Sequence, residues 1–341
     1  MRVGILTGGG DCPGLNPAIR GAVMRGLDFG FEMVGILDGW KGILEKATVP
    51  LGLDDVREII HLGGTILGTS RTNPFKDDCT AQKTKENFRA LGLDALIAIG
   101  GDDTLGAALK LTKEGYNVVG VPKTMDNDLS ETDYTFGFDS AVSVAVDAVD
   151  RLRDTAKSHR RVMVMEVFGR HAGWTALFAG IAGGADWILI PEAPVDLDAM
   201  CAHIKAQFEP GGKKYAVVVV AEGVKLGEEV DTGERDQFGH VILKERQLGD
   251  RIASIIKEKT KLETRAVVPS HIMRGGSPTL FDRMLGTRVG VKAAEMVRDG
   301  QFGMMAALRG LDVVAVPLEK AVGVYKTVPL EWYDLAKILF K

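Results

Sequence analysis

The sequence is poor in cysteine, contains no long apolar run and carries no excess of positive charge. Its 3 cysteines among 341 residues are too few and too scattered for a disulfide framework or a zinc cluster. No apolar stretch approaches the ~20 residues that span a bilayer, and the first residues lack the pattern of a secretory leader. We therefore expect a cytoplasmic protein with reduced thiols and no membrane partner.

The charge balance argues against a nucleic-acid partner. Lysine and arginine total 42 against 46 aspartates and glutamates, which gives a net charge of −4. Without a general basic field, a phosphorylated ligand would need arginines concentrated at one place. The apolar fraction of 45% is ordinary for a globular chain, and the length favours two domains.

Short apolar runs rich in β-branched residues alternate with helical patterns along the chain. Several runs are apolar at consecutive positions, as expected of strands covered on both faces. Strand followed by helix, repeated, predicts parallel sheets with crossover helices. The fold class is therefore α/β, with two doubly wound Rossmann-like lobes, mainly parallel sheets and an active site in the cleft between them. The predicted strands are Val3–Leu6, Ala95–Ile99, Val118–Val121, Val162–Val167, Trp187–Ile190 and Ala216–Val220, and the predicted helices are Leu15–Leu27, Thr104–Glu114, Ser140–Ala156, Thr175–Gly183 and Leu197–Phe208.

Ligands of open α/β sheets bind beyond the carboxyl ends of the strands. Three glycines, Gly8–Gly10, follow the first predicted strand and precede a helix, an arrangement that offers backbone N–H groups to a phosphate. The alternative is a tight turn that holds no ligand. Asp102 and Asp103 follow Ala95–Ile99 and two glycines. They could hold Mg²⁺, or they could only favour the start of the next helix.

Polar residues also follow the strand Val118–Val121. Lys123 suits phosphoryl oxygens, and Asp126 could accept a hydroxyl proton. Extended geometry would place Thr124 and Asp126 on one side of the segment and Lys123 on the other. The alternative is a solvated acidic turn, but polar groups at a third strand end favour a binding site.

A fourth polar cluster lies near the C-terminal end of the sequence. Arg265 precedes a run that leads to His271, Arg274 and the glycine pair Gly275–Gly276. Arginine and histidine beside such a pair suit a phosphate monoester. A lone histidine would more often be structural, but the arginine three residues further on favours a ligand.

Seven segments, in this order, resemble the phosphofructokinase family over nearly the whole chain. Each motif alone is weakly specific, whereas seven in register are highly specific. The segments are TGGGDCPGLN at 7–16, GGTILGTSRTNP at 63–74, GGDDT at 100–104, PKTMDND at 122–128, VMVMEVFGRHAGW at 162–174, AEG at 221–223 and SHIMRGGSP at 270–278.

The resemblance is to the pyrophosphate-dependent, mixed-substrate group of 6-phosphofructokinases. It implies reversible phosphoryl transfer from pyrophosphate to the 1-hydroxyl of fructose 6-phosphate, with Mg²⁺ as cofactor. Asp126 would be the general base, assisted by Lys123, Thr124 and Arg71, and Asp102 would bind the metal. Gly10, Asp103 and Lys123 would contact the donor. The sugar phosphate would be held by Thr124, Met125, Asp126, Arg161, Phe168, Gly169, Arg170, Glu222, Arg265, His271, Ile272, Met273 and Arg274.

The resemblance also bears on assembly and domains. In the family, the residues that match Arg161 and Arg265 reach in from a neighbouring subunit, which implies a homodimer or homotetramer with shared sites. We expect a donor-binding lobe of residues 1–138 plus about 262–308. A sugar-phosphate-binding lobe would comprise about 139–261 plus 309–341. The polar segment Lys225–His240 is predicted to be a surface loop or insertion.

The choice of donor rests on Asp103 and Lys123. ATP-using relatives usually carry glycine at both positions, whereas pyrophosphate-using relatives are similar to this sequence. Asp103 would place a carboxylate where the α-phosphate of ATP must lie, and two unit charges ~4 Å apart repel by roughly 4 kcal/mol at an effective dielectric near 20. Lys123 would compensate that charge and neutralise the leaving group. An ATP-dependent enzyme of the same fold is the alternative, with Lys123 and Asp103 as a merely structural ion pair.

Overall fold

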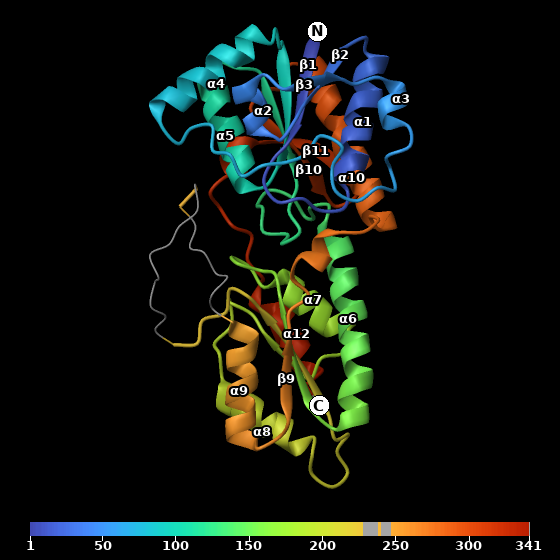
Figure 1. The fold of residues 1–341 in the computed structure, drawn as a ribbon, viewed down its shortest axis with the longest axis vertical. Helices are drawn as coiled ribbons and strands as arrows, with labels where there is room; N and C mark the ends of the chain where they lie inside the picture. The colour runs from blue at the N-terminus through green and yellow to red at the C-terminus, as the bar shows by residue number, and fades with distance from the viewer. Residues whose placement is uncertain (228–237, 240–246, 341) are drawn as a thin grey trace.

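The chain folds into two lobes stacked along the long axis of the molecule (Figure 1). The structure is a computed structural model and describes residues 1–227, 238–239 and 247–340. Most of the predicted surface segment Lys225–His240 lies outside the described residues. Among the residues described, no helix combines the length and the apolar character needed to cross a bilayer. Cys12, Cys79 and Cys201 are all free, as expected.

The first lobe is built on a seven-stranded sheet in the order β11-β10-β5-β4-β1-β2-β3. The inner strands pair in parallel, and the edge strands β11 and β3 pair antiparallel with their neighbours. Helices α1, α3 and α10 cover one face, and α2, α4 and α5 cover the other (Figure 1). The strands are β1 (Arg2–Thr7), β2 (Glu32–Ile36), β3 (Thr48–Pro50), β4 (Ala95–Gly100), β5 (Val118–Pro122), β10 (Met304–Arg309) and β11 (Asp312–Pro317).

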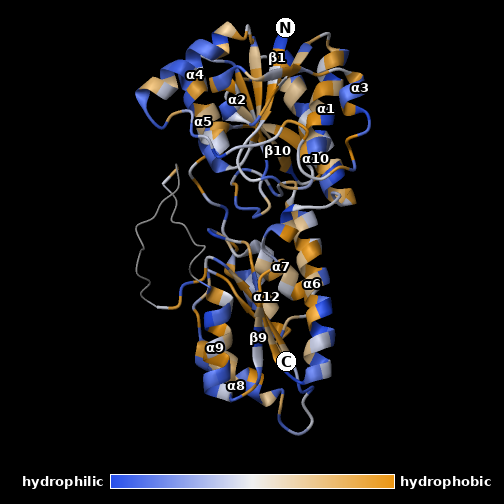
Figure 2. Cartoon of the chain, in the orientation of Figure 1, coloured by the Kyte–Doolittle hydropathy of each residue, from blue (hydrophilic) through white to orange (hydrophobic). Residues whose placement is uncertain are grey.

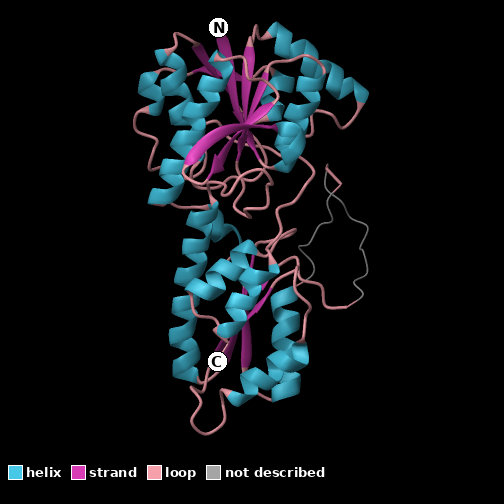
Figure 3. Cartoon of the chain, turned by 180° about the vertical axis from the view of Figure 1, so that it is seen from behind, coloured by secondary structure: helices cyan, strands magenta, loops and turns pink. Residues whose placement is uncertain are grey.

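The second lobe is built on a four-stranded parallel sheet in the order β7-β8-β6-β9. Figure 3 shows from behind how helices enclose the strands of both sheets. The strands are β6 (Val162–Val167), β7 (Trp187–Leu189), β8 (Ala216–Ala221) and β9 (Thr264–Val267). The helices of the two lobes are α1 (Leu15–Asp28), α2 (Trp40–Glu45), α3 (Leu53–Val56), α4 (Asp78–Ala90), α5 (Asp102–Lys113), α6 (Phe138–His159), α7 (Trp174–Ala182), α8 (Leu197–Ala206), α9 (Leu248–Thr260), α10 (Leu280–Arg298), α11 (Leu318–Ala321) and α12 (Leu330–Ile338), with a 3-10 turn η1 (Ser270–Arg274).

The apolar runs of the sequence form strands that are buried on both faces of their sheets. All six residues of β4 and all six of β8 are buried, because helices cover both faces of their sheets. Figure 2 shows the apolar strands inside and the polar faces of the helices outside. The α/β class and the mainly parallel sheets are confirmed, and the six predicted strands are present with ends shifted by at most one residue.

Strand pairing corrects the predicted lobe boundaries at two places. β9, which we assigned to the donor-binding lobe, pairs with β6 in the second sheet. β11, which we assigned to the sugar-phosphate-binding lobe, pairs antiparallel with β10 in the first sheet. The hairpin β10–β11 is short and turns at Arg309–Asp312, so the chain stays in the first lobe until Pro317.

Asp282 ties α10 of the first lobe to the start of α6, which runs along the second lobe (Figure 1). Its carboxylate accepts hydrogen bonds from the backbone N–H of Ser140 at 2.8 Å and from the Ser140 hydroxyl at 2.6 Å. The side chain is fully buried, and burial raises the pKa of Asp282 to about 6, against the opposing effect of the Ser140 hydrogen bonds.

This buried carboxyl predicts a pH-dependent stability. Because the folded-state pKa is raised from 3.8 to about 6, the folded state binds more protons than the unfolded chain in this range. The free energy of unfolding should therefore fall as pH rises from about 4 to about 6, by at most ~3 kcal/mol from this group. Asp282→Asn removes that component. Urea unfolding should show the wild type losing stability relative to Asp282→Asn between about pH 4.5 and about pH 7.5. If the wild type and Asp282→Asn differ in their free energy of unfolding by the same amount at both pH values, the expectation is contradicted.

Candidate active site

Three strand ends of the first lobe lie side by side. β1 pairs with β4 so that Thr7 is opposite Ile99, and β4 pairs with β5 so that Gly100 is opposite Pro122. The backbone N–H of Gly8 donates to the Ile99 carbonyl at 2.9 Å, which leads the glycine loop over the end of β4. The three polar segments that follow these strands therefore leave the sheet together.

Lys123 is the buried cation of this group. Its side chain is only 4% exposed, and its ammonium donates a short hydrogen bond to the carbonyl oxygen of Gly10. Burial lowers the pKa of Lys123, and the positive charge of Arg274 adds to that effect. Gly10 also lies close to Arg274, because a Cβ at this position would be 2.6 Å from a guanidinium nitrogen of Arg274, which would have to shift. Two cations thus converge on the glycine loop.

The segment after β5 bends, which differs from the extended geometry expected from the sequence. Asn127 has a φ of 53°, and the Thr124 hydroxyl accepts the backbone N–H of Asp126 at 3.1 Å. The bend brings Asp126 and Lys123 onto the same site, where the two charges interact. Local hydrogen bonding has therefore overridden the period-two pattern.

In the second lobe, β6 and β8 end side by side, with Val167 opposite Ala221. The turn Phe168–Arg170 follows β6, and Glu222 follows β8. The backbone N–H of Gly223 donates to the Gly169 carbonyl at 3.0 Å. A Cβ at Gly223 would lie 2.3 Å from the Arg170 carbonyl oxygen, so only glycine allows this contact.

Arg274 joins the two sets of strand ends. It lies at the end of η1, its guanidinium stands 4.7 Å from the centre of the Phe168 ring, and one of its nitrogens donates to the Asp11 carbonyl at 3.1 Å. Phe168 belongs to the second lobe and Asp11 to the glycine loop of the first. The site thus lies between the lobes, as the sequence predicted.

Three carboxyl groups in the site are hard to ionise. Burial raises the pKa of Asp126, and the charges of Arg274 and Arg170 oppose this effect. Burial, reinforced by the charge of Asp126, raises the pKa of Asp128 to about 7 and that of Glu222 to about 7. One carboxylate oxygen of Asp126 is buried without a hydrogen-bond partner. Such a group is ready to receive a proton or a donor from a ligand.

Asp102 and Asp103 occupy the first turn of α5, behind the N-cap Gly101. The Asp102 carboxylate accepts the backbone N–H of Gly323 at 2.7 Å, and its charge raises the pKa of Asp128. Within the described residues, no three acidic, histidine or cysteine side chains form a metal-binding group. Mg²⁺ is commonly held by one or two carboxylates together with substrate phosphates and water. The carboxylate oxygens of Asp102, in the first turn of a helix, fit that pattern.

Arg161 and Arg265, which were predicted to bind the sugar phosphate, lie far from this site in their own chain. Arg161 precedes the amino end of β6, and Arg265 lies opposite Met163 near the same end. At ~3.3 Å per residue, Arg161 lies roughly 23 Å from Phe168 at the other end of the strand. Both arginines contact one carboxylate oxygen of Glu263, at 3.7 Å and 3.2 Å.

The remaining predicted residues differ in exposure. Arg71 is exposed, on a segment whose Ser70 carbonyl accepts the backbone N–H of Gly9 at 3.0 Å. His271 is exposed and packs edge-on against Phe168, whereas Ile272 is 73% exposed and Met273 is fully buried.

The sequence analysis missed Tyr325. Its ring stacks on His171 with centroids 4.0 Å apart. Burial, together with the charges of Asp102 and Asp128, raises the pKa of Tyr325 to about 12. Tyr325 follows no parallel strand and belongs to none of the seven motifs, so only the folded chain reveals that it belongs here.

Comparison with known proteins agrees with the fold and the motifs. A sequence model of the phosphofructokinase family matches residues 2–297. A pyrophosphate–fructose 6-phosphate 1-phosphotransferase of Amycolatopsis methanolica is 55% identical over 345 residues, covering 100% of both chains. An ATP-dependent 6-phosphofructokinase of Corynebacterium efficiens is 48% identical, covering 100% of this chain and 99% of that one. A crystal structure of Pichia pastoris phosphofructokinase in the T-state matches with a TM-score of 0.81 at 30% identity, covering 99% of this chain and 36% of that chain.

Fold and site define a two-lobed α/β protein in which cations and carboxyl groups from six strand ends meet between the lobes. The chain belongs to the phosphofructokinase family, as its sequence motifs predicted.

Proposed function

We propose that this protein transfers a phosphoryl group from pyrophosphate to the 1-hydroxyl of fructose 6-phosphate in the cytoplasm. One P–O–P bond breaks and one P–O–C bond forms, giving fructose 1,6-bisphosphate and orthophosphate reversibly. The observation that carries the proposal is the buried Lys123 ammonium, held on the Gly10 carbonyl beside the strand end that bears Asp103. The names of relatives that are 55% and 52% identical to this chain support the same reaction.

The donor site explains the preference for the smaller anion. Burial of the charged Lys123 ammonium is unfavourable, because the ammonium loses its contacts with water. A bound polyanion would offset this free energy by supplying the compensating negative charge. Asp103 stands on the neighbouring segment, where its charge repels the α-phosphate that only ATP would bring. Pyrophosphate has no such group. An ATP-dependent enzyme of the same fold remains the second candidate, favoured by relatives that carry that name.

Asp126 is the general base in this proposal. It is well suited to take the proton of the 1-hydroxyl, because burial raises its pKa and one of its oxygens has no hydrogen-bond partner. Lys123, Arg274 and Arg170 surround it and stabilise negative charge on the transferred group. Thr124 and Arg71 contact that group, while Phe168–Arg170 and Glu222 hold the sugar.

Asp102 would hold Mg²⁺ with donor phosphate oxygens. When bound, the ion neutralises charge on the donor. The backbone N–H of Gly323 fixes the orientation of the Asp102 carboxylate, so that carboxylate is held in place before the donor arrives.

The active form is a homo-oligomer with shared sites. Arg161 and Arg265 lie at the amino end of the second sheet, remote from Phe168 in their own chain. The two arginines of one subunit could therefore bind the 6-phosphate in the site of a partner subunit. There the phosphate would replace Glu263 as their ionic partner.

A donor assay tests the central part of this proposal. Turnover of fructose 6-phosphate with Mg²⁺ should be seen with pyrophosphate and be much weaker with ATP. In the double variant Asp103→Gly, Lys123→Gly, pyrophosphate turnover should be lost. Its affinity for ATP should rise by up to about a thousandfold, the equivalent of ~4 kcal/mol of removed repulsion.

The matched control is Asp198→Gly, because Asp198 is also the second residue of a helix and is exposed. It should leave the donor preference unchanged. If the double variant keeps the wild-type preference, Asp103 does not exclude ATP. If the wild type uses ATP and ignores pyrophosphate, the second candidate is correct.

Subunit mixing tests the shared site. Asp126→Asn and Arg265→Ala should each be nearly inactive alone. When the two variants are unfolded together and reassembled, a hybrid dimer has one site with both native residues. Random pairing makes half of the dimers hybrids, so activity should recover to about a quarter of the wild-type value. A mixture that stays inactive, while wild type treated in the same way recovers, would show that Arg265 is not shared.

A further inference from the structure

The chain between α11 and α12, residues 322–329, passes from the first lobe to the second and borders the site. We call it the crossing segment. Gly323 donates its backbone N–H to Asp102, Tyr325 forms a β-bridge with Leu129, and Val328 donates its N–H to Glu192 at 2.9 Å. Glu192 also accepts the N–H of Gly173, just before α7. The crossing segment thus contacts the donor side, the loop after β5 and the second lobe in turn.

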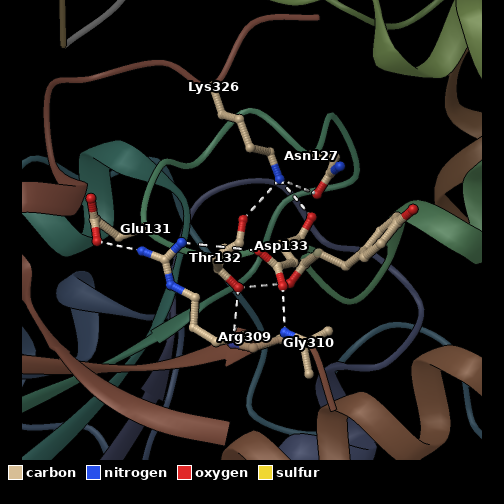
Figure 4. Close-up of polar contacts among 9 residues, drawn as sticks. Asn127, Glu131, Thr132, Asp133, Arg309, Gly310 and Lys326 are labelled. Carbon is tan, nitrogen blue, oxygen red and sulfur yellow. Dashed lines mark hydrogen bonds and ion pairs between the residues drawn. The ribbon is translucent and has the colours of Figure 1, made fainter. Parts of the chain in front are cut away.

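Lys326 is the most fully bonded residue that we find in the crossing segment. Figure 4 shows its ammonium at the centre of a polar network. It donates to the side-chain oxygen of Asn127 and to the carbonyl oxygens of Thr132 and Asp133, each at 2.9 Å. A lysine ammonium has three N–H donors, so all three are used.

The backbone of Lys326 is bonded as well. Its N–H donates to the Asp128 carbonyl at 2.7 Å, and its carbonyl accepts the indole N–H of Trp174 at 2.8 Å. Trp174 begins α7 of the second lobe. Lys326 therefore fixes the loop that carries Asp126 and Asp128 against the opposite lobe.

Asn127 is the link from Lys326 to the site. It is 1% exposed, lies between Asp126 and Asp128, and adopts a left-handed backbone conformation with a φ of 53°. Its side-chain oxygen also accepts the backbone N–H of Thr135 at 3.1 Å. Such a conformation is uncommon outside glycine and persists only where the surroundings hold it. Because Asn127 directly follows Asp126, a displacement of Asn127 would also move the backbone that carries the Asp126 carboxylate.

The acidic side chains around Lys326 favour the charged form of its ammonium. Asp133 lies on one side, and its carboxylate accepts the backbone N–H of Gly310 at 2.6 Å and is 4.0 Å from Arg309. Arg309 is itself paired with Glu131 at 2.5 Å. Burial lowers the pKa of Lys326 to about 8, while Asp133 and Asp128 favour the charged form. The acidic partners therefore offset part of the cost of burying the cation.

We propose that Lys326 is a positioning residue for phosphoryl transfer, which holds Asp126 in its working direction through Asn127. The proposal rests on the proposed function, because it assumes that Asp126 is the general base. It assigns Lys326 no contact with either substrate. Loss of its three hydrogen bonds should therefore lower kcat and leave both KM values nearly unchanged.

The test combines two substitutions with turnover of fructose 6-phosphate and Mg-pyrophosphate. Lys326→Met keeps the length of the side chain and removes the donors. It should lower kcat by about tenfold to a hundredfold, as expected for a misplaced catalytic group. Lys326→Arg keeps charge and some donors and should lose less. Lys320→Met, an exposed lysine of α11, is the matched control and should match the wild type.

The decisive comparison is made in the Asp126→Asn background. If Lys326 acts through Asp126, Lys326→Met should cause no further loss of the residual kcat there. An equal loss in both backgrounds, or a kcat within about twofold of wild type in a folded Lys326→Met protein, would overturn the proposal. If Lys326→Met does not fold by circular dichroism, Lys326→Arg takes its place in both backgrounds. Failure of the proposed function is seen separately, as absent pyrophosphate turnover in the wild type or full activity in Asp126→Asn.

Discussion

The site depends on a lysine ammonium that has been taken out of water between two lobes. Lys123 donates to the Gly10 carbonyl, and burial together with Arg274 disfavours its charged state. A buried cation beside further cations is unfavourable on its own. It becomes favourable when a polyanion binds. Asp126 is in the opposite position, because burial disfavours its charge and one of its carboxylate oxygens has no hydrogen-bond partner.

In both lobes the charged and polar residues of the site follow the carboxyl ends of parallel strands, and these two sets of strand ends face each other. Registers of β1, β4 and β5 align three loops of the first lobe, and those of β6, β8 and β9 align three of the second. Arg274, α6 with Asp282, and the crossing segment hold the two sets together.

Much of this could be predicted from the sequence, because it depends on local patterns. The apolar run Ala95–Ile99 had to be a strand covered on both faces, and the polar residues after it had to lie at a sheet edge. Pairing partners could not be predicted in the same way. β9 has only four residues and pairs with the distant strand β6, and the hairpin β10–β11 joins the first sheet through the pairing of β10 with the distant strand β5. The bend after β5 was missed because, besides the local bond between Thr124 and Asp126, it is held by Thr135 and Lys326, which belong to other segments. Tyr325 was missed for the same reason.

The central claim is that Lys123 is held ready for the donor anion. A crystal structure with Mg²⁺, fructose 6-phosphate and the slowly reacting donor analogue imidodiphosphate tests it most directly. We expect the Lys123 ammonium on a phosphate oxygen of the analogue, the Asp126 carboxylate within hydrogen-bond distance of the sugar 1-hydroxyl, and Asp103 beyond the end of the donor. An analogue bound elsewhere, with Lys123 still bonded only to the Gly10 carbonyl, would contradict the account.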